Sequence, residues 1–166
     1  SALDEGLGDA ADTGLDPLPA VDPSMLRRRL VTGPLTPHAK PWRRHRDLPY
    51  GDHARRNHLD VWCRDDLPTD AKAPVLLEVH GGAWVIGNKE QQAMPLMAHM
   101  AERGWVCVSI NYRLSPRSTW PDQIVDVKRA IAWVRENAGE LGIDPAMICI
   151  TGGSAGGHLA ALMGLT

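Results

Sequence analysis

Ser154 lies in a glycine-rich turn that could present a nucleophile. The segment Met147–Thr151 is apolar and rich in strand formers, and His158–Met163 suits a helix. The pattern Gly152-x-Ser154-x-Gly156 occupies the turn between them. Glycine accepts the close packing and strained backbone that such a turn needs, which leaves the serine hydroxyl protruding. The start of a helix offers free N–H groups and partial positive charge to an oxyanion. Alone, the motif fits a plain strand–helix turn with a solvated serine as well as a turn that presents a nucleophile for acyl transfer.

A second glycine-rich turn could supply hydrogen-bond donors. The apolar strand Val75–Val79 runs into His80-Gly81-Gly82-Ala83-Trp84. Acyl transfer needs N–H groups aimed at the oxyanion of a tetrahedral intermediate. We expect these donors to be the backbone N–H groups of Gly82, Ala83 and Ala155, with Gly81 as a further candidate.

Three other residues are expected to shape the site rather than to react. His80 could be proposed as a general base, but the nearest partners for its ring nitrogens are in the backbone of its own loop. We therefore predict a structural role for His80. Gly152 and Gly156 are predicted to allow the tight turn around Ser154.

These two turns together resemble the α/β-hydrolase superfamily, specifically its hormone-sensitive-lipase-like and related bacterial carboxylesterase and arylformamidase-like branches. The resemblance covers about Arg46 to Thr166. Two residues depart from the hormone-sensitive-lipase signature: Gly153 stands where an acidic residue is usual, and Ala83 replaces a third glycine. Further landmarks agree with the superfamily: His58-Leu59-Asp60-Val61-Trp62, Asn111-Tyr112-Arg113-Leu114-Ser115-Pro116 and Trp120-Pro121.

The resemblance implies a triad whose acid and base follow the serine, and we expect both beyond residue 166. A serine hydroxyl needs such a base to become a good nucleophile. His158 lies one helical turn after Ser154, but no carboxylate is placed to orient it. The chain is therefore expected to be the N-terminal portion of a longer hydrolase, ending after the nucleophile turn and inactive alone.

The elements that position these turns alternate between strand and helix. This alternation predicts an α/β fold with a mostly parallel sheet and helices on both faces. Residues 42–166 are expected to form the N-terminal part of the hydrolase domain, and residues 1–41 an acidic tail with an irregular continuation. The expected elements are two entry strands, 44–48 and 59–64, strands at 74–79 and 105–110, and helices at 95–103 and 122–140.

Composition excludes some functions. A net charge of −2 gives no reason to expect a nucleic-acid partner. No apolar run approaches the roughly 18 residues that span a bilayer. No signal peptide is visible, so a cytoplasmic location is favoured but not established. Cys63, Cys107 and Cys149 lie in predicted strands without metal-ligand spacing, and we expect buried, reduced thiols. No cofactor or metal is implied.

The predicted function is cleavage of small-molecule acyl esters, as in carboxylesterases and lipases. Two alternatives stay open: an amide-directed relative, such as an arylformamidase or peptidase, or a non-catalytic partner module that lacks the base. The expected unpaired sheet edge after Ser154 favours completion by a second chain or by further sequence, or dimerisation.

Overall fold

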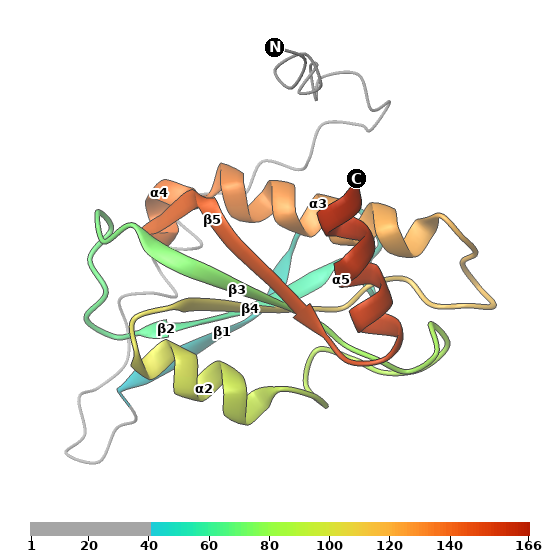
Figure 1. Cartoon of the computed structure of the whole chain (residues 1–166), viewed down its shortest axis with the longest axis horizontal. Coiled ribbons are helices and arrows are strands. Elements are labelled where there is room, and N and C mark those ends of the chain that lie inside the picture. Colours follow the sequence, from blue (N-terminus) through green and yellow to red (C-terminus); the bar gives the residue numbers. More distant parts are fainter. Residues whose placement is uncertain (1–40) are drawn as a thin grey trace, which may run out of the picture.

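The computed structural model describes residues 41–166, and its elements follow the predicted alternation (Figure 1). The predicted tail lies outside the described residues apart from Pro41, so the domain boundary stays a prediction. In chain order the elements are β1 (Trp42–Pro49), β2 (His58–Arg64), β3 (Ala73–Val79), α2 (Met94–Glu102), β4 (Val106–Ile110), α3 (Asp122–Glu136), α4 (Ala138–Leu141), β5 (Ile143–Gly152) and α5 (Ala155–Leu165).

The strands form one five-stranded sheet in the order β1-β2-β4-β3-β5. Strands β3, β4 and β5 are parallel, whereas β1 and β2 add two antiparallel pairings. The expected α/β fold is thus confirmed, in a mixed sheet. The register pairs Val79, at the end of β3, with Ile110 on one side and Gly152 on the other. The turns after β3 and β5 therefore start at the same edge of the sheet.

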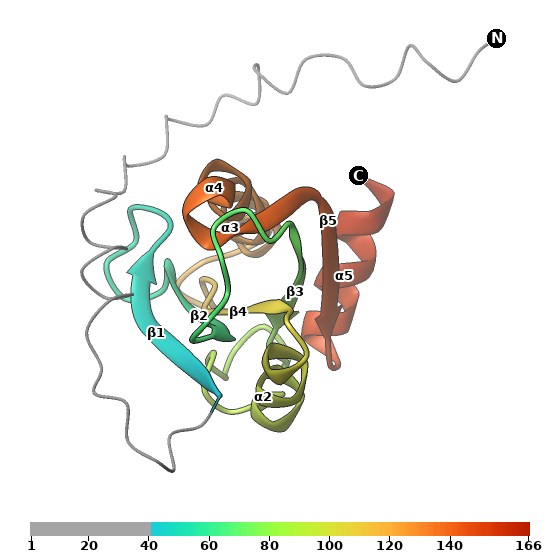
Figure 2. The same ribbon diagram turned by 90° about the vertical axis from the view of Figure 1, so that its left-hand side faces the viewer.

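Helices cover both faces of the sheet (Figures 1 and 2). Alternate residues of β3 explain why, since Val75, Leu77 and Val79 pack in one hydrophobic core with residues of α3 and α5. Leu76 points the other way and packs with Met97 of α2. Both faces of β3 and β4 are buried, as their continuous apolar sequences require, whereas β5 is only partly buried.

Two details differ from the sequence-based predictions. The helix expected over 122–140 divides at Asn137 into α3 and the short α4, which ends at Gly142 in a left-handed conformation. Cys63 and Cys107 are buried as expected, but Cys149 is exposed, which corrects the prediction of a third buried thiol. The reason is the position of β5, which pairs only with β3 among the described strands, so Cys149 lacks a covering neighbour.

No helix within residues 41–166 is long and apolar enough to cross a membrane.

Glu78 is a buried carboxyl group next to the C-terminal end of β3. It is 2% exposed, and its Oε2 atom has no hydrogen-bond partner among the described residues. Burial raises the pKa of Glu78 from 4.5 to about 8. The folded protein therefore keeps this group protonated at neutral pH, whereas the unfolded chain ionises it.

This difference predicts a pH-dependent stability. Below pH 4.5 both states hold the proton; between pH 4.5 and about 8 only the folded state does, so the free energy of unfolding falls as pH rises. Replacing Glu78 by Gln should remove this loss, which amounts to about 3–5 kcal/mol. Urea titrations at pH 5, 7 and 9 would measure it, with Glu136→Gln on exposed α3 surface as control. Parallel pH profiles for wild type and Glu78→Gln would contradict the prediction.

Candidate active site

Ser154 follows Gly153 in the two-residue turn between β5 and α5, in a backbone conformation that few non-glycine residues adopt. Its φ of 53° and ψ of −118° lie in a region that costs a non-glycine residue about 1–3 kcal/mol. The residue is exposed, and its hydroxyl makes no capping hydrogen bond to the helix that follows. The predicted strand–turn–helix is therefore present, and it leaves the Ser154 hydroxyl facing solvent at the N-terminus of α5.

The glycines around Ser154 allow two backbone segments to touch. A Cβ atom on Gly156 would lie 1.8 Å from the carbonyl oxygen of Val79, and one on Gly152 would lie 2.5 Å from the same oxygen. A Cβ atom on Gly81 would lie 2.7 Å from the oxygen of Gly153. No side chain fits in these spaces, so the glycines bring the Ser154 turn against the loop that follows β3.

Gly156→Ala should destabilise the protein, because its Cβ would meet backbone that cannot rotate away. We expect a loss of about 1–3 kcal/mol in the free energy of unfolding. Gly164→Ala in the same helix has no atom within 4 Å of its new Cβ and should instead gain about 1 kcal/mol from helix propensity. Urea denaturation of both variants tests this contrast. Equal changes in the free energy of unfolding would show that the close packing at Gly156 does not constrain the side chain there.

The loop after β3 turns through three residues with positive φ: Gly82 at 119°, Ala83 at 51° and Trp84 at 60°. The carbonyl of Gly82 accepts hydrogen bonds from the N–H groups of Val85 and Ile86, both at 3.0 Å, which closes the turn. Within residues 41–166, no hydrogen bond engages the N–H groups of Gly82 and Ala83. The two groups are thus available as donors.

The other two predicted donors differ from each other. The N–H group of Gly81 donates to Oε1 of Gln92 at 2.9 Å, so it is engaged in this structure. Ala155 is the first residue of α5, where helix geometry provides no intrahelical acceptor for its N–H group. The structure therefore favours Gly82, Ala83 and Ala155 over Gly81 as donors, and the oxyanion role of each stays a prediction.

His80 is fully buried and holds this loop in place. Its Nδ1 atom donates to the carbonyl of Gly81 at 2.7 Å, and its Nε2 faces the guanidinium of Arg56 at 3.3 Å. Because an arginine can only donate, Nε2 must be the acceptor and the ring must be neutral. Burial, together with Arg56, lowers the pKa of His80 to about 4. These contacts occupy both ring nitrogens and fit the predicted structural role.

Arg56 was not singled out from the sequence, yet it connects three segments of the site. Its Nε donates to the carbonyl of Tyr112 at 2.8 Å, and its Nη2 reaches the carbonyl of Gly87 at 3.0 Å as well as His80. The Tyr112 ring stacks on His80 with centroids 4.3 Å apart, and its hydroxyl donates to the His80 carbonyl. In the sequence, Arg56 is one of several arginines, and nothing distinguishes it from a solvated residue.

His158 lies near Ser154 without being equipped as a base. Its ring contacts the ring of Trp84 edge-to-face, with centroids 5.3 Å apart. No carboxylate of the described residues pairs with it or bonds to it. A search of residues 41–166 for three or more histidine, cysteine or acidic side chains that could hold a metal finds no such group.

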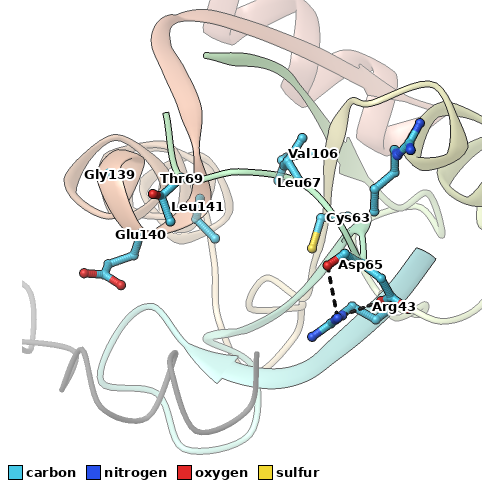
Figure 3. Close-up of a pocket in the computed structure, with 10 residues that line it drawn as sticks. Arg43, Cys63, Asp65, Leu67, Thr69, Val106, Gly139, Glu140 and Leu141 are labelled. Atoms are coloured by element: carbon cyan, nitrogen blue, oxygen red, sulfur yellow. Dashed lines mark hydrogen bonds and ion pairs between the residues drawn. The ribbon is translucent and has the colours of Figure 1, made fainter. Parts of the chain in front are cut away.

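A cavity of about 480 Å³ lies away from Ser154 (Figure 3). It is lined by Cys63 at the end of β2, Val106 at the start of β4 and Leu141 before β5. Figure 3 shows the ion pair of Arg43 and Asp65 at its rim. These residues lie at the edge where the parallel strands begin, whereas Ser154 lies where they end. The cavity is therefore separate from the candidate active site.

Comparison with known proteins places this geometry in context. The family model BD-FAE matches residues 59–166. The chain is 61% identical over 120 residues to the "Probable carboxylic ester hydrolase LipM" of Mycobacterium tuberculosis, an alignment that covers 72% of this chain. The chain spans 28% of the length of that relative.

Two solved structures share the fold. The "Truncated form of carbohydrate esterase from gut microbiota" has a TM-score of 0.69 and 35% identity, over 78% of this chain and 46% of the other. A structure of Thermogutta terrifontis esterase 2, described as phosphorylated by paraoxon, has a TM-score of 0.63 and 33% identity, over 71% and 46%.

Proposed function

The chain belongs to the BD-FAE family, and from this we propose that it carries the nucleophile and oxyanion hole of a serine-dependent carboxylic ester hydrolase. The observation that carries the proposal is Ser154, exposed in a strained turn directly against the loop of Gly81–Ala83. The names of its relatives, among them a carboxylic ester hydrolase and a carbohydrate esterase, support ester hydrolysis.

In the proposed reaction, Oγ of Ser154 attacks the carbonyl carbon of a small-molecule ester. The electron pair of the C=O bond moves to its oxygen, and the N–H groups of Gly82, Ala83 and Ala155 stabilise this oxyanion. Collapse of the intermediate breaks the ester C–O bond. The leaving oxygen receives the proton that the general base took from Ser154 and departs as the alcohol, and an acyl group stays on Ser154. Water then attacks the acyl carbonyl in the same way and releases the acid.

The hydroxyl proton of Ser154 needs an acceptor. We propose that this acceptor is a histidine, oriented by a carboxylate, and that both lie outside residues 1–166. His80 is unsuited because both of its ring nitrogens are engaged, and His158 has no carboxylate partner among the described residues. The short span of this chain on its relative is consistent with the proposal. The histidine and the carboxylate would come from further sequence or from a second chain that pairs with the edge of β5, which no other described strand covers.

Covalent labelling tests the proposal. A fluorophosphonate would be added to the intact protein that contains this sequence, and to the 166-residue chain by itself. An organophosphorus reagent is suitable because the related esterase 2 is phosphorylated by paraoxon. We expect one adduct, mapped by peptide mass spectrometry to Ser154, in the intact protein, and none in the chain alone. An intact protein that stays unlabelled, or that is labelled at another residue, would overturn the proposed function and favour a non-catalytic module.

A further inference from the structure

A smaller cavity, of about 300 Å³, opens beside the loop that follows β3. Its walls come from residues 53–56, between β1 and β2, from residues 114–118, after β4, and from Val85. Cavities of this size accept part of a small molecule. The wall at 114–118 is ordered by its own hydrogen bonds, since Oγ of Ser115 donates to the Ser118 carbonyl at 3.0 Å and the Ser118 N–H donates to the Leu114 carbonyl at 3.1 Å.

The cavity is positively charged. Arg55, Arg56 and Arg117 line it, and none of its lining residues is an aspartate or glutamate. Within the described part of the chain, Arg55 and Arg117 form no ion pair. The Arg56 guanidinium is held by two carbonyls and a neutral imidazole, so its charge is not cancelled there. Three like charges that share a cavity repel one another, and an anion bound among them would relieve this repulsion.

His53 adds a neutral donor to this set. Its Nδ1 atom accepts hydrogen bonds from the backbone N–H groups of Arg55 and Arg56, at 3.3 Å and 3.2 Å. The ring proton must then reside on Nε2, which can donate to a ligand. Guanidinium groups match the paired oxygens of carboxylate and phosphate, so the cavity has the chemistry of an oxyanion site.

The cavity shares its loop with the proposed oxyanion hole. Val85 lines the cavity, and its N–H group bonds to the carbonyl of Gly82. The carbonyl of Trp84 accepts a hydrogen bond from the N–H group of Ser115 in the cavity wall at 2.8 Å, while the Trp84 ring contacts His158 on α5. Trp84 therefore connects the helix that follows Ser154 with the wall of the cavity.

We propose that this cavity binds a carboxylate or phosphate group of the ester substrate, so that the enzyme selects esters with a negative charge remote from the scissile carbonyl. The inference rests on the proposed function, because it takes Ser154 as the reacting group. Arg55 and Arg117 would bind the anionic group directly. Arg56, already hydrogen-bonded to the loop, would add electrostatic attraction.

Binding can be measured without turnover. The intact protein with Ser154→Ala would be titrated calorimetrically with monoethyl succinate, which carries a carboxylate, and with the neutral diethyl succinate. We expect the charged ester to bind more tightly. Arg55→Gln and Arg117→Gln should each weaken its binding about tenfold and leave the neutral ester unchanged. Arg135→Gln, on the exposed last turn of α3, removes the same charge elsewhere and should change neither.

Equal binding of the two esters, or equal effects of Arg117→Gln and Arg135→Gln, would overturn the proposal. A competition titration with inorganic phosphate shows whether the cavity binds the charged group of a substrate or a free anion. If phosphate displaces monoethyl succinate, and Arg117→Gln lowers the affinity for both, the cavity binds the charged group of the substrate as proposed. If phosphate binds through these arginines without displacing the ester, the cavity serves a free anion and the selection of charged esters is refuted. Fluorophosphonate labelling of wild-type Ser154 reports on the proposed function independently of these titrations.

Discussion

Ser154→Ala should abolish fluorophosphonate labelling of the intact protein and lower its ester turnover by a factor on the order of 10⁶. The reason is that the proposed mechanism has one nucleophile, and no neighbouring group takes its place. The hydroxyl makes no capping bond, so its removal should leave the fold intact. Mass spectrometry after labelling and initial rates on a chromogenic ester would measure the two losses. Ser109→Ala is a suitable control, because that hydroxyl is buried in β4 and has no partner among the described residues.

The same position offers a test of stored strain. Alanine and glycine both lack the hydroxyl, but only glycine adopts φ of 53° with ψ of −118° at little cost. Ser154→Gly should therefore be more stable than Ser154→Ala by about 1 kcal/mol or more, although both are inactive. Equal stabilities would show that the turn relaxes when the hydroxyl is lost. Residual labelling in Ser154→Ala would contradict the assignment of the nucleophile itself.

The backbone of the site was predictable from sequence because glycine spacing encodes it directly. Gly152 and Gly156 flank Ser154 at positions where a side chain would collide with Val79, so the pattern in the sequence reports a contact in space. The strand before His80 was equally visible, since a short continuous apolar run is typical of a buried strand.

The supporting side chains were not predictable. Arg56 is 24 residues from His80 and 56 from Tyr112, and no local pattern reports contacts over such separations. The hydrogen bond from Gly81 to Gln92 likewise depends on how the loop returns towards α2. The exposure of Cys149 depends on which strand, if any, lies beside β5, a property of the assembled sheet and not of the segment.

Gly82→Ala should lower kcat/KM by about 10²–10³, the usual effect of losing one oxyanion donor. A side chain at this position meets two obstacles: the φ of 119° excludes L-residues, and the new Cβ would lie 2.1 Å from the carbonyl oxygen of Ile86. The loop must move, and with it the N–H groups of Gly82 and Ala83. Gly82→Pro should lose at least as much, because proline removes the donor and fixes φ near −65°.

A matched glycine separates the loss of a donor from a general loss of stability. Gly104, after α2, also has a positive φ, 85°, but no atom lies within 4 Å of a Cβ built there. Gly104→Ala should therefore be destabilised by backbone strain while keeping its kcat/KM and its rate of fluorophosphonate labelling. If Gly82→Ala matched Gly104→Ala in both rates, the loop after β3 would not form the oxyanion hole. A decrease confined to Gly82→Ala, in a protein that denaturation shows to be folded, would place the donor at the reacting carbonyl, because only there does a backbone N–H group change the rate and not merely the fold.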